Sequence, residues 1–287
     1  MLRDMLSLTE SRCVIGGYST RVLERAHDAD TTLLFIHGWA DSADTFRPLM
    51  DELADLPARF VAVDLPHFGG ADDLAPGPQL PQYVNFANAA LRTYADRGRL
   101  LPIGQSLGGR ALLMGLNAPG APKLDHCMVI GPAPLEPPTW QKMLVRNASV
   151  ATSASKLGGP VDRETQLQEL LKSFKRTCFA NCDQVPESVW RDYLSHYTDL
   201  RIARHMDSLR SLAAEFQQPL DLSSLQCEVD IVWGDLDRMA PVAGAERYQL
   251  ALTRSRLTIF AGCGHHAHLE RVKETAALIR SLLSPLA

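Results

Sequence analysis

Ser106 lies in the stretch Gly104-Gln105-Ser106-Leu107-Gly108, between an apolar run and a helix-forming run. A turn this tight forces the serine into a strained backbone conformation, and side chains two positions away would collide. Glycine avoids those collisions and leaves the hydroxyl exposed at the start of a helix, where the dipole favours developing negative charge. The pattern G-x-S-x-G, with a strand before it and a helix after it, therefore predicts a serine nucleophile.

A serine hydroxyl attacks a carbonyl carbon only when a histidine takes its proton and an acid orients that histidine. Both residue types follow Ser106 in the chain. The candidate acids lie in WGDLDRMAP (233–241) and the candidate bases in FAGCGHHAHLE (260–270): Asp235, Asp237, His265, His266 and His268. The order serine, acid, histidine is compatible with a catalytic triad for acyl transfer.

The elements that must position these residues alternate between strand and helix. Continuous Val/Ile/Leu runs are typical of strands buried on both faces of a parallel sheet. They occur at 31–38, 58–66, 99–106, 126–134, 227–235 and 255–262. Helices are predicted at 44–56, 81–98, 106–117 and 274–284, and an antiparallel strand pair at 12–26. This alternation predicts an α/β fold.

Residues 135–218 interrupt the alternation with polar and helical sequence. We expect residues 1–134 and 219–287 to form the core and residues 135–218 to form a helical cap. Apolar residues of the cap could line a pocket or pack the cap onto the core, and packing is the more common role for any single one. The candidates are Trp140, Met143, Leu144, Leu170, Leu171, Phe174, Phe179, Trp190 and Tyr193.

The composition is that of an ordinary globular protein. The chain has 287 residues, 46% hydrophobic and 22% charged, with a net charge of -4. No basic run indicates a nucleic-acid partner, and no segment approaches the roughly 20 apolar residues of a membrane helix. The start lacks the apolar core of a signal peptide, so we expect a cytoplasmic protein with its six cysteines reduced. Cys178 and Cys182 could form a redox pair or half a metal site, although no partner motif accompanies them.

With these motifs in order, the chain resembles the α/β-hydrolase superfamily. The resemblance rests on HGW (37–39), GQSLGG (104–109) and the two C-terminal stretches that hold the acids and histidines. It runs from the first strand to the last helix. It implies a mostly parallel central sheet flanked by helices, with a helical cap inserted after the sixth strand.

The resemblance also implies roles for single residues. The family pattern G-x-x-D-x-x-x-P matches Gly234, Asp237 and Pro241, which makes Asp237 the acid and Asp235 a turn residue. The pattern G-H-x-x-x-x-E makes His265 the base, and Glu270 would orient the loop or cap the last helix. For His266 and His268 we expect positions at the surface or at a helix entry.

In the family the HGW loop supplies half of an oxyanion hole. The resemblance implies that the backbone N–H groups of Trp39 and Leu107 are the two donors, while His37 braces the loop. We expect Trp39, Gln105 and Trp140 to line the substrate pocket. In DLPHFGGAD (64–72), His67 replaces the first glycine found in relatives, near the mouth of the site.

These residues predict a serine hydrolase that cleaves carboxylic esters of small or medium acyl chains, without metal or cofactor. HGW, rather than an HGGG loop, favours the smaller-ester branch. A thioesterase or lactonase would use the same residues. A carbon–carbon bond hydrolase is also possible, although such relatives often carry Asn where Gln105 stands. A hydrolase-fold ligand-binding protein with little turnover is a further alternative. The expected partner is a small ester, with neither nucleic acid nor membrane; the exact substrate and the oligomeric state stay open.

Overall fold

Eight strands form one sheet in the computed structural model, which describes residues 7–136, 163–195, 199–218 and 220–283. The strands are β1 (Thr9–Ile15), β2 (Tyr18–Arg25), β3 (Thr31–Ile36), β4 (Arg59–Val63), β5 (Arg99–Gln105), β6 (His126–Ile130), β7 (Glu228–Gly234) and β8 (Ser255–Phe260). Their order across the sheet is β1-β2-β4-β3-β5-β6-β7-β8. The β1–β2 and β2–β4 pairs are antiparallel, and the others are parallel. The predicted mostly parallel sheet with an antiparallel edge is confirmed.

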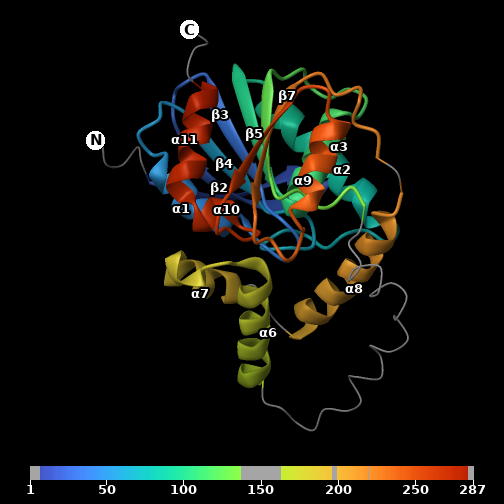
Figure 1. Ribbon diagram of the computed structural model, residues 1–287. Coiled ribbons are helices and arrows are strands. Elements are labelled where there is room, and N and C mark those ends of the chain that lie inside the picture. The colour runs from blue at the N-terminus through green and yellow to red at the C-terminus, as the bar shows by residue number, and fades with distance from the viewer. Residues whose placement is uncertain (1–6, 137–162, 196–198, 219, 284–287) are drawn as a thin grey trace.

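Helices flank both faces of this sheet (Figure 1). They are α1 (Arg47–Glu52), α2 (Gln79–Tyr94), α3 (Ser106–Leu116), α6 (Arg163–Cys178), α7 (Glu187–Ser195), α8 (Asp199–Glu215), α9 (Ala243–Ala251), α10 (Ala267–Glu270) and α11 (Val272–Leu283), with short 3₁₀ turns η2 (Ala43–Phe46) and η3 (Cys182–Gln184). The helix predicted at 44–56 is shorter than expected. Its first turn is the 3₁₀ turn η2, and the α-helix starts only with Pro48 in its first turn.

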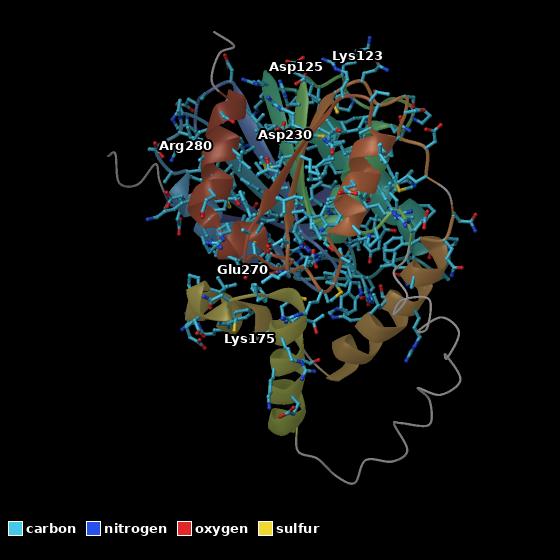
Figure 2. The ribbon with its side chains drawn as sticks, viewed as in Figure 1. Lys123, Asp125, Lys175, Asp230, Glu270 and Arg280 are labelled. Atoms are coloured by element: carbon cyan, nitrogen blue, oxygen red, sulfur yellow. The ribbon has the colours of Figure 1, made fainter. Side chains whose placement is uncertain are left out.

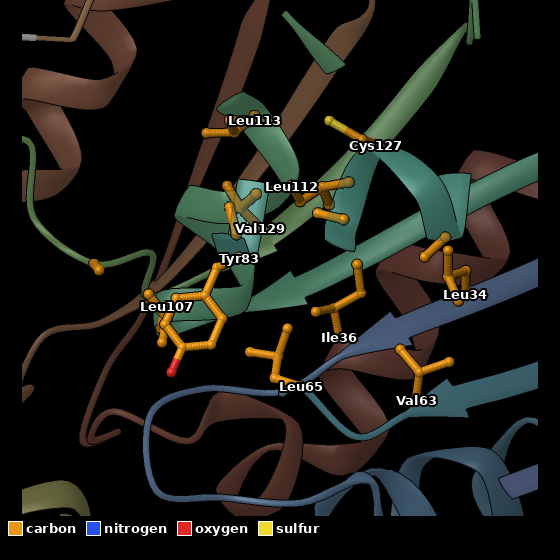
Figure 3. Packing of buried hydrophobic residues seen from close by; sticks show 14 of the residues in the cluster. Leu34, Ile36, Val63, Leu65, Tyr83, Leu107, Leu112, Leu113, Cys127 and Val129 are labelled. Carbon is orange, nitrogen blue, oxygen red and sulfur yellow. The ribbon is translucent and has the colours of Figure 1, made fainter. Parts of the chain in front are cut away.

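Alternate residues of the central strands face opposite layers of helices, because successive side chains of a strand point to opposite faces. Leu34 and Ile36 of β3 pack in the cluster that includes residues of α2, α3 and α9 (Figure 3). Leu33 and Phe35 pack in the second cluster, with residues of α1 and α11. Both sheet faces are therefore buried, which explains the continuous apolar runs in the sequence.

Between β6 and β7, the described residues form helices α6, α7 and α8. They lie together beyond one end of the sheet, at the lower edge of the molecule in Figure 1. The carboxylate of Glu215, at the end of α8, accepts hydrogen bonds from the amides of Gln79 and Leu80 at 3.0 and 2.8 Å. It thereby caps the start of α2, whose own N-cap residue Pro78 makes no side-chain hydrogen bond. This contact fastens α8 to the core.

Within the described ranges, no helix combines the length and the apolar character that crossing a membrane requires.

Candidate active site

Ser106 is the first residue of α3 and follows β5 directly. Its backbone φ is +50°, in the left-handed region that residues other than glycine rarely adopt. A Cβ at Gly104 would lie 2.7 Å from Gly109 Cα, and a Cβ at Gly108 would lie 2.3 Å from the carbonyl oxygen of His37. These contacts confirm why glycine flanks the serine on both sides.

Gly108→Ala is expected to destabilise the protein by about 3 kcal/mol, because the new methyl group overlaps backbone atoms that cannot rotate away. Those atoms are the carbonyl oxygens of Ile36 and His37, at 2.4 and 2.3 Å. Urea unfolding followed by circular dichroism measures the change. Gly244→Ala is the matched control, since its Cβ would make only ordinary contact, at 3.4 Å, with Trp233. A Gly108→Ala variant as stable as the wild type would contradict the close packing of α3 on β3.

His265 and Asp237 come from the loops that follow β8 and β7, which are neighbouring parallel strands. His265 Nδ1 lies 2.6 Å from Asp237 Oδ2, and both side chains are buried. The other carboxylate oxygen of Asp237 accepts hydrogen bonds from the amides of Met239 and Ala240 at 2.9 and 2.8 Å. Asp235 is exposed and accepts from the Cys263 amide at 3.3 Å. Of the two candidate acids, the structure therefore brings Asp237 to His265.

Gly131, at the end of β6, lies behind this pair with a φ of +48°. A Cβ there would lie 3.2 Å from His265 Nδ1 and 3.4 Å from Asp237 Oδ2. The His265 amide also donates to the carbonyl oxygen of Cys178 at 2.6 Å. The imidazole and the carboxylate are thus packed against backbone, which fixes their mutual orientation.

Trp39 and Leu107, the predicted oxyanion donors, line the same pocket as Ser106 and His265. The Leu107 amide is in the first turn of α3, where backbone N–H groups have no acceptor within the helix and can donate to an anion. Gly38 packs on the serine turn so closely that a Cβ there would lie 2.9 Å from Ser106 Cβ. The loop that holds Trp39 is therefore in contact with the residue predicted to be the nucleophile.

His37 braces this loop, as expected. Its Nδ1 lies 2.8 Å from the Gly38 carbonyl oxygen, and its Nε2 accepts from the Leu65 amide at 2.8 Å. These partners require a neutral ring that carries its proton on Nδ1. Complete burial lowers the pKa of His37 and keeps the ring neutral. His37 therefore has both ring nitrogens occupied by backbone.

The pocket holds about 540 Å³ of space between protein atoms, part of it open to solvent. Its wall is mostly apolar and combines residues at the carboxyl end of the sheet with residues of α6 and α8. A mostly apolar wall is typical of small-molecule sites. The lining residues are Trp39, Gln105, Ser106, Leu107, Ala133, Pro134, Phe174, Cys178, Leu209, Leu212, Phe216, Met239, Ala240, His265 and His266.

Some of the residues predicted to line the pocket do so, and others pack elsewhere or lie outside the described residues. Trp39, Gln105 and Phe174 line the pocket, whereas Phe179 and Trp190 pack on each other with ring centroids 4.9 Å apart. Trp140, Met143 and Leu144 lie outside the described residues, as do the side chains of Leu170, Leu171 and Tyr193. Sequence reasoning missed Leu209, Leu212 and Phe216, although their spacing of three and four residues is that of one helix face.

Glu270 links the loop that holds His265 to the segment that follows α6. One carboxylate oxygen accepts from the Gly264 amide at 2.8 Å, and the other accepts from the amides of Ala180 and Asn181, each at 2.9 Å. Figure 2 shows Glu270 where the sheet and its flanking helices meet α6 and α7, with Lys123 and Asp125 at the opposite end of the molecule. The expectation that Glu270 orients the loop holds, and the carboxylate also anchors the segment that follows α6.

His266 and His268 are both buried, so of the two expected positions the surface is excluded and the helix entry holds, with His268 as the second residue of α10. His266 does stand at a helix entry, as the N-cap residue of α10. His268 faces Phe46, with ring centroids 4.8 Å apart, and neither of its ring nitrogens has a hydrogen-bond partner among the described residues. The short helix α10 turns these side chains into the core, which a local sequence pattern does not reveal.

His268→Leu is expected to stabilise the protein by about 1 kcal/mol at neutral pH, because it removes two buried polar atoms without partners. Burial lowers the pKa of His268 well below its usual value. The unfolded chain binds a proton at this residue below about pH 6.5 and the folded protein does not, so stability falls as pH decreases from there. The leucine variant should therefore gain more at pH 5 than at pH 8. Urea unfolding at both pH values measures this, and an equal gain at both would contradict a buried neutral histidine.

His67 has a φ of +76°, in the left-handed region that favours glycine. Its ring lies 5.5 Å from that of Phe68 and 5.6 Å from that of His205 on α8, measured between centroids. The Trp39 ring also faces His205, at 6.3 Å. His67 thus makes an aromatic contact with α8 beside Trp39.

Comparison with known proteins gives a consistent result. A sequence profile described as the alpha/beta hydrolase family matches residues 33–278. The chain is 26% identical over 269 residues to the monoacylglycerol lipase ABHD6 of Rattus norvegicus, covering 88% of this chain and 75% of that protein.

Solved structures share the fold at low sequence identity. A 2-hydroxy-6-oxo-6-phenylhexa-2,4-dienoate hydrolase from Rhodococcus sp. superposes with a TM-score of 0.73 at 20% identity, covering 96% of this chain and 98% of that one. An esterase from Exiguobacterium antarcticum also has a TM-score of 0.73, at 18% identity, with 96% and 99% covered. Likeness at these identities extends to the fold and leaves the substrate open.

Proposed function

The chain belongs to the alpha/beta hydrolase family, and on that premise we propose that it is a serine hydrolase that cleaves carboxylic esters of small or medium acyl chains. The observation that carries the proposal is a single pocket onto which both Ser106 and the Asp237-paired His265 open. The similarity to a monoacylglycerol lipase supports ester substrates. We propose further that residues 135–218 form the cap that closes this pocket over the core.

In the proposed acylation step, Ser106 Oγ attacks the ester carbonyl carbon while His265 Nε2 accepts the hydroxyl proton. Asp237 accepts a hydrogen bond from the Nδ1–H group of His265, which keeps that proton on Nδ1, leaves Nε2 unprotonated before attack and stabilises the imidazolium afterwards. His265 then gives its proton to the leaving alcohol. This division of roles uses the 2.6 Å contact between His265 and Asp237 directly.

The carbonyl oxygen becomes negative during the attack and needs donors at that moment. We propose the backbone N–H groups of Trp39 and Leu107 for this role. The tight packing of Gly38 on Ser106 supports it, because that packing holds the Trp39 loop in place before substrate arrives. In the second half-reaction a water molecule, deprotonated by His265, attacks the acyl-enzyme and releases the acid.

The apolar part of the wall suits an acyl chain. It is formed by Phe174, Leu209, Leu212, Phe216 and Met239. Burying a short chain against such residues is favourable by about 0.8 kcal/mol for each CH₂ group. The kcat/KM for ester hydrolysis should therefore rise with acyl chain length until the pocket is filled and then fall.

Hydrolysis of p-nitrophenyl acetate, butyrate and octanoate, with butyryl-CoA and a small lactone beside them, tests the proposal. We expect ester turnover and labelling of Ser106 by a fluorophosphonate, located by peptide mass spectrometry. Faster thioester or lactone turnover would move the assignment to those classes. Folded protein that turns over none of them would overturn the proposal in favour of a carbon–carbon bond hydrolase or a ligand-binding protein.

A further inference from the structure

A buried guanidinium stands behind the wall of the pocket. Arg110 lies on α3, one turn after Ser106, and is only 1% exposed. No carboxylate of the described residues forms an ion pair with it, and its Nε atom has no hydrogen-bond partner among them. Burial lowers the pKa of this guanidinium, which nevertheless stays charged. A buried cation without a counterion is costly, so stability alone does not account for an arginine at this position.

The guanidinium of Arg110 contacts two residues from different parts of the chain. Its Nη1 atom donates to the carbonyl oxygen of Pro134, which follows β6. Its Cζ atom lies 4.5 Å from the ring centroid of Phe216, which follows α8, in a cation–π contact. Pro134 and Phe216 both line the pocket, whereas Arg110 is not one of the described residues that line it. Any effect of Arg110 on a substrate must therefore pass through these two residues.

The segment that holds Pro134 is fixed to the serine turn and to α9. The amide of Ala133 donates to the carbonyl oxygen of Ser106 at 2.8 Å, and the Ala133 carbonyl oxygen accepts from the hydroxyl of Tyr248 at 2.5 Å. Phe216 lies far from this segment in the sequence. The guanidinium therefore joins a wall segment that is anchored to the nucleophile with one that arrives from α8.

We propose that Arg110 is a positioning residue that sets the separation of Pro134 and Phe216 and thereby limits the size of the ester group that the pocket accepts. This inference rests on the proposed ester hydrolysis. A guanidinium suits this task because it offers several donors in one plane and also stacks on aromatic rings. Methionine, an apolar side chain of similar length, provides neither contact, so in Arg110→Met the ring of Phe216 is no longer held against the wall and yields to larger groups.

Two pairs of esters measure this size limit. The first pair, p-nitrophenyl butyrate and p-nitrophenyl octanoate, differs on the acyl side. The second pair, ethyl butyrate and hexyl butyrate, differs on the alcohol side. For each pair, the kcat/KM of the larger ester is divided by that of the smaller one, for the wild type and for Arg110→Met. Intrinsic differences in reactivity between the two esters cancel when the ratios of two enzymes are compared.

Arg25→Met is the matched control for the loss of a buried arginine. Arg25 is 6% exposed, donates to the carbonyl oxygen of Met50, and has its Cζ atom 5.8 Å from the ring centroid of Phe60. It thus makes the same two kinds of contact as Arg110, but none of these three residues lines the pocket. Arg25→Met should leave both ratios unchanged.

We expect at least one ratio to rise about fivefold in Arg110→Met, in the range of one cation–π contact. The pair that responds says which side of the ester lies beside Pro134 and Phe216. Arg110→Lys, which keeps a cation, should raise the ratio less. In a Phe216→Leu background, which lacks the ring, Arg110→Met should change the ratio less than twofold, because two residues that act through one contact are not additive.

A second measurement leaves Arg110 in place. Phe216 is replaced by a phenylalanine with three ring fluorines, which nearly keeps the shape of the ring and weakens its negative face. This replacement should raise the same ratio. It decides the matter if Arg110→Met fails to fold, since an unchanged ratio would show that the cation–π contact does not set the size limit.

Ratios in folded Arg110→Met within twofold of the wild type for both pairs would overturn the inference. An equal rise in the Phe216→Leu background would do the same, since Arg110 would then act by another route, and so would an equal rise in Arg25→Met. The wild type hydrolyses esters in all these cases, so the proposed function stands. If folded wild-type protein hydrolyses none of the four esters, the proposed function fails and this inference fails with it.

Discussion

Ser106→Ala is expected to lower kcat/KM for p-nitrophenyl butyrate by about 10,000-fold or more while leaving the fold intact. The hydroxyl is the only part of this side chain that reacts, and the predicted triad residues act as a unit, so losing one removes most of their joint effect. What remains would come from the pocket and the oxyanion donors alone. Initial rates at several substrate concentrations, corrected for spontaneous hydrolysis, measure the loss.

Ser224→Ala is the matched control for this experiment, because Ser224 is exposed, does not line the pocket, and donates its hydroxyl proton to Asn117 Oδ1 at 2.7 Å. It should keep full activity. Urea unfolding of Ser106→Ala should match the wild type within about 0.5 kcal/mol, since the methyl side chain adopts the same backbone conformation. A folded alanine variant that retains a tenth of the activity would show that Ser106 is not the nucleophile.

Asp237→Asn is expected to lower kcat/KM by about 10,000-fold, whereas Asp235→Asn should change it less than twofold. Asparagine can still accept from the amides of Met239 and Ala240 through its carbonyl oxygen. It then presents its NH₂ group to His265 Nδ1, which favours the tautomer with the proton on Nε2. That tautomer cannot take the proton of Ser106. The substitution therefore keeps the side-chain volume and nearly all the contacts of Asp237, but it places the His265 proton on the wrong ring nitrogen.

The two aspartates stand two residues apart, which makes them a matched pair for assigning the acid. Steady-state kinetics on one ester, with unfolding curves for both variants, separates lost chemistry from lost folding. If Asp235→Asn were the inactive variant and Asp237→Asn active, the exposed carboxylate of Asp235 would have to be the acid that orients His265. The 2.6 Å contact between His265 and Asp237 would then have a purely structural role.

Local pattern was enough to predict the framework of this protein. The apolar runs predict β3 to β7 because a strand buried on both faces must be apolar throughout. The run at 255–262 also predicts β8, but this edge strand is only partly buried, so the expectation that it is buried on both faces is wrong. The turn at Ser106 could be predicted because its glycines avoid steric clashes that arise within a few residues of the serine. Chain order alone left two acids and three histidines open, and the resemblance to the α/β-hydrolase superfamily then implied His265 as the base and Asp237 as the acid.

Contacts between residues distant in sequence were decided by the tertiary structure alone. The burial of His266 and His268, the pairing of His266 with Asp41 and the link from Glu270 to Ala180 all join segments that fold separately. No periodicity in one segment encodes where a side chain meets another segment, because that depends on how the sheet, the loops and helices α6 to α8 pack together. The sequence thus determined which chemistry the chain could carry, and the packing of α6 and the segment after it against residues 264–270 decided which polar atoms are buried beside the pocket.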